Sequence, residues 1–390
     1  MSDRLYYTDA YLARFDARVV ERLVWEGRPA ARLDRTAFYP VSGGQPSDRG
    51  TMGPVPVVDV VEREDGEIVH VLDRPLDGED RVQCEIDWPR RLDHMQQHTG
   101  QHLLSAALER ARGISTLSFH LGSDASTIDV AAAVTLDELA PVEELANRVI
   151  HENRPVHVRF VDPAEAASLP LRKPPARQGT LRVIEIEALD VSACGGTHVA
   201  RTGELGLLAL TGAERYKGGT RLEFVCGGRA VARFQALRSS ASSAARLLST
   251  TAADLAASIE RLQGELKQRR QEVRDWQERA ITAEAERLLA SSAGNRRVIA
   301  RHFPDWEPQA LKRLATMLAG HPGVVAVLVG SEPGTVVVAC GTESGMDASA
   351  VVRELTSRFG GRGGGRAGMA QAGSLAASPS EILSAALAIA

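Results

Sequence analysis

The sequence predicts an α+β protein in four parts: a small N-terminal β-barrel, a metal-bearing α+β domain, a long helical segment with a coiled-coil pattern, and a C-terminal α/β domain. Three observations favour this class. Short β-branched segments separated by Gly, Pro and Asp fill residues 1–88. Apolar residues recur at spacings of three and four across 240–290, and buried strand runs alternate with helical segments after 295. We therefore expect domains at 1–88, 89–238, 239–293 and 294–390.

The composition is that of an ordinary globular chain. Of its 390 residues 44% are hydrophobic and 25% charged, and the net charge of −4 means that any RNA-binding surface must be local. The four cysteines, Cys84, Cys194, Cys226 and Cys340, are too few and too scattered for a disulfide framework. The sequence contains no run of about twenty apolar residues and no secretory signal. We expect a cytoplasmic protein without a membrane partner.

The N-terminal part reads as strands at 16–25, 55–61 and 67–72. A small barrel is the natural packing for many short strands without helices. Within it lies Ser42-Gly43-Gly44-Gln45, where two glycines expose the backbone between two polar side chains. On sequence alone this stretch is either a plain turn or a loop placed at a functional site.

Two pairs of metal-type ligands dominate the second part. His98 and His102 lie four residues apart in a predicted helix, Trp88 to Arg112, so both imidazoles face the same side. Cys194 and His198 flank a Gly-Gly turn that can aim both at one point. Three nitrogens and one sulfur suit tetrahedral zinc, so we expect one Zn²⁺ per chain.

The spacing of the four ligands is compatible with more than one kind of zinc site. Zinc peptidases place a glutamate general base directly after the first histidine, and Thr99 occupies that position here. A site with four protein ligands is also compatible with a purely structural zinc.

The remainder of the second part alternates strands and helices. We expect strand material at 115–134, a helix at 136–153, and strands at 156–161, 181–186, 204–210 and 220–226, the last two flanking Glu214 to Lys217. A Pro-rich loop, 169–178, carries Arg172, Lys173 and Arg177, which either contact phosphate or are simply solvated. Cys226 and a hydrogen-bonded His120 are expected in or beside the core.

The helical segment from about 240 to 290 must bury its apolar seam against a second helix of the chain or the same helix of another copy. A homodimer through this helix and the C-terminal domain is therefore expected. The seam consists of Leu255, Ile259, Leu262, Leu266, Val273, Trp276, Ala280 and Ala283.

The C-terminal part has buried strand runs at 298–301, 324–330 and 335–340, with helices at 309–319, 348–358 and 379–387. Cys340 is expected in its core. The glycine-rich stretch 360–373 exposes backbone N–H groups beside two cations, a combination suited to phosphate. The residues concerned are Arg362, Gly363, Gly364, Gly365 and Arg366.

Three of these motifs carry a resemblance to a known family. The run His94 to Ser105, followed by Ser192 to His198, resembles the HxxxH…CxxxH editing domain of alanyl-tRNA synthetases and of the free-standing AlaX proteins, and all four ligand positions match. The stretch 38–50 is similar to the glycine-rich motif of the AlaX barrel. The run GGRGGGR…AQAG resembles the DHH-associated domain that ends alanyl-tRNA synthetases and the long AlaX proteins.

The resemblance implies trans-editing, the hydrolysis of serine or glycine from wrongly charged alanine tRNA. It places the Ser42–Gln45 loop near the editing site or the tRNA acceptor end, and it links Thr99 and Gln101 to amino-acid discrimination. It makes Arg362 to Arg366 a tRNA contact. Zinc would activate water, polarise the ester carbonyl, or only organise the pocket. The competing hypothesis is a non-catalytic, zinc-organised tRNA-binding protein.

Overall fold

The computed structural model describes residues 2–78, 80–173, 179–292, 297–330, 332 and 334–389. It divides the chain into two compact units, Met1–Ser243 and Ala244–Ala390, each with its own sheets and helices. The predicted α+β class is confirmed. The finer division into four domains remains a prediction. Within the described ranges, no helix is both long enough and apolar enough to cross a lipid bilayer.

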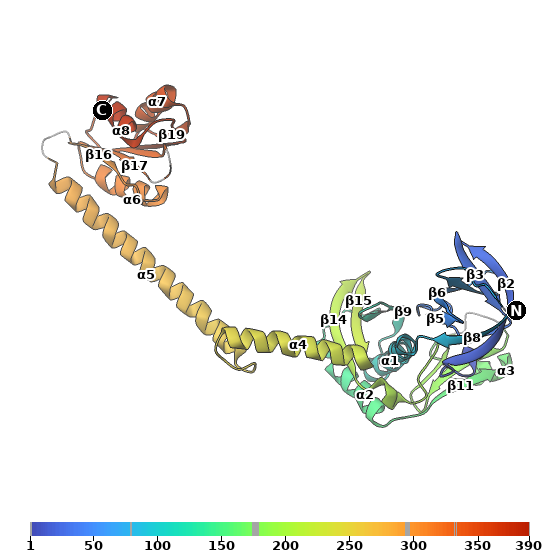
Figure 1. Cartoon of the computed structure of the whole chain (residues 1–390). Helices are drawn as coiled ribbons and strands as arrows, with labels where there is room; N and C mark the ends of the chain where they lie inside the picture. The colour runs from blue at the N-terminus through green and yellow to red at the C-terminus, as the bar shows by residue number, and fades with distance from the viewer. Residues whose placement is uncertain are drawn as a thin grey trace. The chain divides into compact units, whose positions relative to one another are not determined.

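The predicted barrel is confirmed: six strands close in the order β2-β3-β7-β6-β5-β8 (Figure 1). Buried and exposed residues alternate along β2, with Phe15, Ala17 and Val19 pointing inward. A two-stranded ribbon of β1 (Asp3–Arg4) and β4 (Arg35–Thr36) and the 3₁₀ helix η1 (Leu5–Tyr7) belong to the same region. The barrel strands are β2 (Arg14–Trp25), β3 (Arg28–Leu33), β5 (Gly50–Met52), β6 (Val55–Glu62), β7 (Ile68–Leu72) and β8 (Arg81–Ile86).

Helix α1 (Trp88–Arg112) runs over the predicted range, and its ends have clear causes. The Asp87 carboxylate caps it by accepting from the Arg90 amide, Pro89 suits its first turn, and Gly113 ends it in the left-handed region. Gly100 allows close packing, because a Cβ there would lie 2.3 Å from the Cys226 sulfur. The helix is therefore fixed tightly against the core.

Two antiparallel sheets pack around α1, in the orders β14-β15-β10-β9 and β11-β12-β13. Helix α2 (Ala140–His151) lies against α1, preceded by the 3₁₀ helix η2 (Asp137–Leu139). The strands and remaining helices are β9 (Thr116–Leu121), β10 (Ser126–Val130), β11 (Val156–Val161), α3 (Pro163–Ser168), β12 (Leu181–Ile186), β13 (Asp190–Ala193), η3 (Thr202–Leu205), β14 (Leu208–Tyr216) and β15 (Gly219–Cys226).

Two expectations for this region are wrong in detail. The predicted strand at 204–210 is instead the end of η3 followed by the start of β14. Strand β14 then continues to Tyr216, so the predicted connector from Glu214 to Lys217 is mostly part of this strand. The turn between β14 and β15 is at Lys217 and Gly218. The reason is pairing: the polar end of β14 is held by β15, as in the Glu214–Arg221 pair. Similarly, His120 is exposed on β9 rather than in the core.

The single helix expected from 240 to 290 is two helices, α4 (Gly227–Leu247) and α5 (Leu255–Ala290). The break contains a run of β-branched and hydroxyl residues that favour local side-chain hydrogen bonds over helix. Ser249 adopts a positive φ of 50°, and the Thr251 hydroxyl donates to Asp254 at 2.6 Å.

The predicted seam of α5 is not the face that packs near the C-terminal end of this helix, where Ala280 and Ala283 are exposed. The residues buried against α6 (Pro308–Ala319) are instead Ile281, Ala285 and Leu288. Of the preceding seam residues, Leu255 is half-buried and the others are exposed: Ile259, Leu262, Leu266, Val273 and Trp276.

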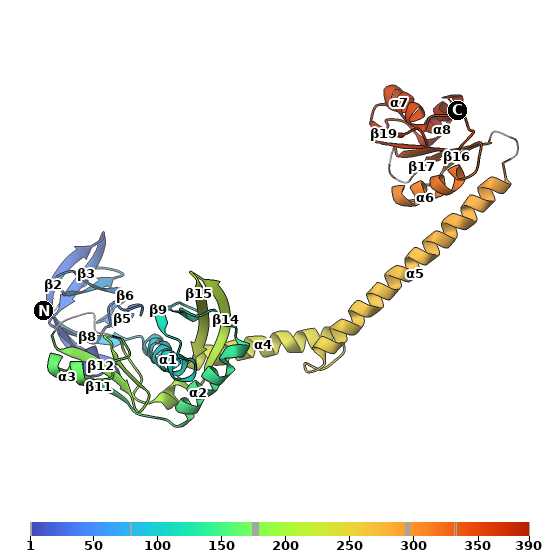
Figure 2. The ribbon, with the colours of Figure 1, turned by 180° about the vertical axis from the view of Figure 1, so that it is seen from behind.

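The C-terminal sheet has the order β16-β17-β18-β20-β19, with α6 on one face and α7 and α8 on the other (Figure 2). Successive residues of β17 are buried on opposite faces, Val325 toward α7 and α8 and Ala326 toward α6. The elements are β16 (Arg297–His302), β17 (Val324–Val329), β18 (Val336–Cys340), α7 (Ala348–Phe359), β19 (Arg362–Arg366), β20 (Met369–Gly373) and α8 (Pro379–Ile389).

The glycine-rich stretch 360–373 is therefore a β-hairpin rather than a loop. Strand β19 is an edge strand with all five residues exposed, paired only with β20. Two of its glycines have a packing reason, since a Cβ at Gly363 or Gly365 would come within 2.7 Å of neighbouring residues. Gly364 has open space beside it.

Candidate metal centre

The two predicted ligand pairs meet in space. One ligand atom from each of His98, His102, Cys194 and His198 lies within 4.8 Å of the other three. The three histidines are almost fully buried, and Cys194 is partly exposed. The Cys194 sulfur lies 3.4 Å from Nε2 of both His98 and His198. This group can hold a metal ion, and its nitrogen and sulfur donors fit a borderline-soft metal.

Each histidine is also held from behind through its other ring nitrogen. Nδ1 of His98 lies 2.7 Å from Gln45 Oε1, and Nδ1 of His198 lies 3.1 Å from the Thr99 hydroxyl. Nδ1 of His102 lies 3.0 Å from the Asp190 carboxylate. Such partners orient the rings and leave the Nε2 atoms for a metal.

Asp190 extends this support outward. Its carboxylate accepts from the Arg172 guanidinium at 2.7 Å and from the Ser192 hydroxyl. Against the desolvating effect of burial, the His102 and Arg172 contacts keep the pKa of Asp190 below its usual value, so it stays an acceptor. Arg172 is therefore committed to this network, and the expectation that it contacts phosphate is not supported by its position.

The turn that carries Cys194 and His198 needs a glycine at Gly196. A Cβ at that position would lie 2.2 Å from His98 Cε1, whereas one at Gly195 would meet nothing closer than 3.8 Å. Arg182 fixes the turn from outside by donating to the carbonyls of Cys194 and Gly196 at 2.8 and 2.9 Å. One of the two glycines is thus required by the metal centre itself.

The surroundings of Cys194 favour its thiolate. Burial alone would raise the pKa of this thiol, but the neighbouring imidazoles of His98, His198 and His102 outweigh it and hold the pKa well below the usual value. Burial lowers the pKa of His198 to about 3, which keeps this imidazole neutral. Deprotonated thiolate and neutral imidazole are the forms that bind metals.

The Ser42–Gln45 stretch is a tight turn beside this centre. Ser42 and Gln45 exchange backbone hydrogen bonds, and Gly43 and Gly44 adopt φ values of 57° and 84°, which glycine tolerates best. Ser42, Gly43 and Gly44 are exposed, whereas Gln45 is fully buried and reaches His98. The stretch thus splits into an exposed tip and an internal side chain that cannot contact a macromolecule.

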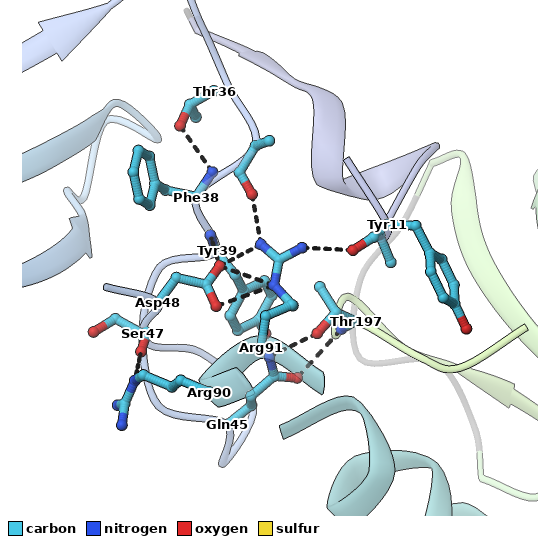
Figure 3. A network of polar contacts seen from close by, with 12 residues as sticks. Tyr11, Thr36, Phe38, Tyr39, Gln45, Ser47, Asp48, Arg90, Arg91 and Thr197 are labelled. Atoms are coloured by element: carbon cyan, nitrogen blue, oxygen red, sulfur yellow. Dashed lines mark hydrogen bonds and ion pairs between the residues drawn. The ribbon is translucent and has the colours of Figure 1, made fainter. Parts of the chain in front are cut away.

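An ion pair with no solvent exposure ties this barrel segment to α1 (Figure 3). The Arg91 guanidinium donates to both carboxylate oxygens of Asp48 and to the carbonyls of Ala10 and Ala37. The second Asp48 oxygen also accepts from the Tyr39 amide at 2.6 Å. Because breaking a buried pair leaves an uncompensated charge, this contact fixes the barrel segment against the helix.

Thr99 and Gln101 lie on the ligand helix in different roles. Thr99 is fully buried, and its oxygen accepts from the Val199 amide beside His198. Gln101 is 7% exposed and donates to the Ser105 hydroxyl at 2.9 Å, which also accepts from Thr116 at 2.8 Å. Thr99 therefore supports His198, whereas Gln101 belongs to a separate group of polar side chains with Ser105 and Thr116.

Among the described residues, the other sequence candidates do not belong to the ligand group. Cys226 is buried in the core, and Lys173 lies exposed with its ammonium 3.4 Å from the Leu117 carbonyl. Arg177 lies outside the described residues. Arg362 to Arg366 form β19 of the second unit, exposed as expected.

Sequence reasoning missed the supports Asp190, Asp48 and Arg91. Nothing in their local sequence marks them, since each acts on a partner far along the chain. The one available signal is charge: an aspartate such as Asp190, at the start of an otherwise apolar strand, needs a buried partner.

Comparisons with known proteins show which families the chain resembles. The family described as "Threonyl and Alanyl tRNA synthetase second additional domain" matches residues 181–223, and the DHHA1 domain matches residues 295–389. The alanyl-tRNA editing protein AlaX-L of Pyrococcus horikoshii is 31% identical over 406 aligned residues, which cover 99% of this chain and 98% of the relative.

Two further relatives match a smaller share of their own length. An alanine–tRNA ligase of Pyrobaculum neutrophilum is 34% identical over 388 residues, covering 94% of this chain and 42% of the ligase. The alanyl-tRNA editing protein Aarsd1-A of Xenopus laevis is 40% identical over 202 residues, 50% of this chain and 49% of the relative.

Proposed function

This chain belongs to the AlaX-L family of alanyl-tRNA editing proteins, and from that membership we propose that it is a zinc-dependent deacylase that removes serine or glycine from mischarged tRNA(Ala). The observation that carries the proposal is the donor set: two separate motifs converge on one point, and each imidazole is held from behind. We place the reaction in the cytoplasm, where translation consumes charged tRNA.

The reaction is transfer of an acyl group from a ribose hydroxyl to water. His98, His102, Cys194 and His198 would hold one zinc ion, which when bound supplies a Lewis acid at the ester. The chain's own contribution is to orient the three imidazoles and to favour the ionised form of the Cys194 thiol. A set of four protein donors is compatible with an ion that organises the pocket and with one that acts on the ester.

Discrimination between serine and alanine calls for a polar group that meets the serine hydroxyl. A pocket that only encloses the side chain distinguishes serine from alanine weakly. A buried polar group that bonds the serine hydroxyl would be left unpaired by alanine, and this disfavours alanine strongly. We propose Gln101 for this role, because its carboxamide lies on the ligand face of α1 beside the hydroxyls of Ser105 and Thr116. Thr99 would act indirectly, by holding His198.

The tRNA contacts are proposed at two places. The exposed tip Ser42-Gly43-Gly44 offers backbone groups near the acceptor end, and Arg362 and Arg366 with the intervening glycines offer charge and backbone amides to phosphates. We also propose a homodimer through α5, whose exposed residues from Ile259 to Trp276 need an apolar partner. Sedimentation at micromolar concentration would show a monomer if this last proposal is wrong.

The deciding experiment is deacylation of Ser-, Gly- and Ala-tRNA(Ala), measured as the amount of amino acid released. We expect rapid release from the first two, and loss of both zinc and activity in Cys194→Ala/His198→Ala. Zinc-loaded protein that binds tRNA(Ala) but releases no amino acid would instead support the non-catalytic binding protein.

A further inference from the structure

Gln45 is the one side chain of the barrel that touches a proposed metal ligand through a described hydrogen bond, and it also contacts Thr197, which lies between the two ligands of the second pair. Its Oε1 lies 2.7 Å from Nδ1 of His98 and accepts from the Thr197 amide at 3.2 Å. Its Nε2 donates to the Thr197 hydroxyl at 2.8 Å. One amide thus bridges the HxxxH helix and the turn that carries Cys194 and His198.

The Thr197 contacts settle which way the amide points. A backbone N–H can only donate, so the Gln45 atom that faces Thr197 N must be the oxygen. The same oxygen faces His98 Nδ1, which must therefore carry the proton. In the neutral imidazole a proton on Nδ1 leaves Nε2 unprotonated, and Nε2 is the atom that faces Cys194.

The barrel keeps Gln45 in this position. The turn before it is closed by the Ser42–Gln45 backbone pair, and the chain after it is anchored three residues later by the buried Asp48–Arg91 pair (Figure 3). A Cβ at Gly196 would lie 3.1 Å from Gln45 Oε1, so the amide also fits closely against the turn.

We propose that Gln45 is a positioning residue of the metal centre, which fixes the ligand tautomer of His98 and joins the two ligand pairs. The inference rests on the metal centre of the proposed function, but not on its reaction. The barrel is then part of the metal site, because it supplies the group that prepares one ligand.

The test measures zinc affinity by competition with a chromogenic chelator, and ligand geometry by the visible spectrum of the Co²⁺-substituted protein. Gln45→Met keeps the length of the side chain but removes the amide, and should weaken zinc binding about 10–100-fold and alter the Co²⁺ spectrum. Gln45→Glu keeps an acceptor for both N–H groups and should rescue affinity to within roughly threefold of wild type.

Gln97→Met is the matched control. Gln97 is another fully buried glutamine, it precedes His98 in α1, and its amide binds the backbone of Cys226 rather than any ligand. This variant should lose fold stability but keep zinc affinity. Thr197→Val, which removes only one contact of Gln45, should give a smaller loss and covers the case in which Gln45→Met does not fold.

Equal zinc affinities in wild type, Gln45→Met and Thr197→Val would overturn the inference, and so would equal losses in Gln45→Met and Gln97→Met. The proposed function fails separately, since wild-type protein that binds zinc but deacylates no tRNA leaves the affinity comparison intact.

Discussion

Gly196 lies so close to His98 that its α-hydrogen cannot be replaced by a methyl group without a clash. A methyl group there would overlap the His98 ring and press on Gln45. We predict that Gly196→Ala weakens zinc binding by about 10–100-fold, the range typical of a disturbed ligand support.

Gly195→Ala is the control on the same turn, since its added methyl would make only ordinary contact with Tyr7, no closer than 3.8 Å. Both variants can be compared by zinc content after dialysis against a weak chelator. Equal zinc retention in the two proteins would contradict the close approach of Gly196 to His98.

His70 is predicted to make the barrel sensitive to acid. Its ring is fully buried between the Thr36 hydroxyl and the Ala31 carbonyl, and burial lowers its pKa to about 4. The unfolded chain takes up this proton near pH 6.5, so stability is complete above that pH and falls as the pH drops toward 4. By pH 5 the loss is about 2 kcal/mol.

His70→Gln can keep both hydrogen bonds without gaining a charge. Urea unfolding at pH 7.5 and pH 5 should therefore show a smaller acid loss in the variant, by about 2 kcal/mol. A loss of the same size in both proteins would mean that His70 does not titrate in this range on unfolding.

The four proposed ligands were predictable from the sequence because each pair is defined by local spacing. Their supports were not, because the contacts join distant segments: Gln45 reaches Thr197 across 152 positions, and His102 reaches Asp190 across 88. Gln45 was named for a loop near the editing site or the tRNA acceptor end, and its side chain is buried against His98. A glutamine beside two glycines gives no sign of which way it faces.

Among the elements, helix α1 and the strands β11 and β12 coincide with the predicted ranges because their patterns are long or strongly apolar. The errors lie where local propensity and tertiary pairing disagree. The α4–α5 break follows from Ser and Thr side chains that bond locally, and β19 forms because β20 pairs with a glycine run that has little strand propensity of its own.

Strand β19 carries the prediction on RNA binding. If Arg362 and Arg366 contact phosphates, Arg362→Gln/Arg366→Gln should weaken tRNA binding and reduce the slope of log K against log salt by about 2, one per lost contact.

Arg353→Gln is the matched control, since Arg353 is an exposed arginine on the neighbouring helix α7. Filter binding at several salt concentrations would measure all three proteins. Parallel salt dependences in the wild type and the double variant would count against phosphate contacts at β19.

For the whole molecule, the two units are predicted to separate cleanly. Each hydrophobic cluster among the described residues lies within one unit, with three in Met1–Ser243 and two in Ala244–Ala390. A fragment of residues 1–243 should therefore fold, retain zinc and cleave substrate at saturating tRNA, because the whole ligand shell lies within it.

The cost of the deletion should be in tRNA binding rather than in cleavage. Single-turnover deacylation at increasing fragment concentration separates the two, since weaker binding raises the half-saturating concentration and leaves the maximal rate unchanged. A fragment with full affinity, or one that loses its zinc, would contradict this division of labour.

The four cysteines should differ in reactivity, so that alkylation of the protein reports its metal content. Burial raises the pKa of Cys84 to about 12 and also raises those of Cys226 and Cys340, so these three thiols resist alkylation in the folded state. Cys194 alone combines a lowered pKa with partial exposure. Iodoacetamide should therefore label the metal-depleted protein once, at Cys194, and leave the loaded protein unmarked. The labelled fraction, measured by mass spectrometry in a crude extract, would then give the fraction of metal-free protein before purification can remove metal.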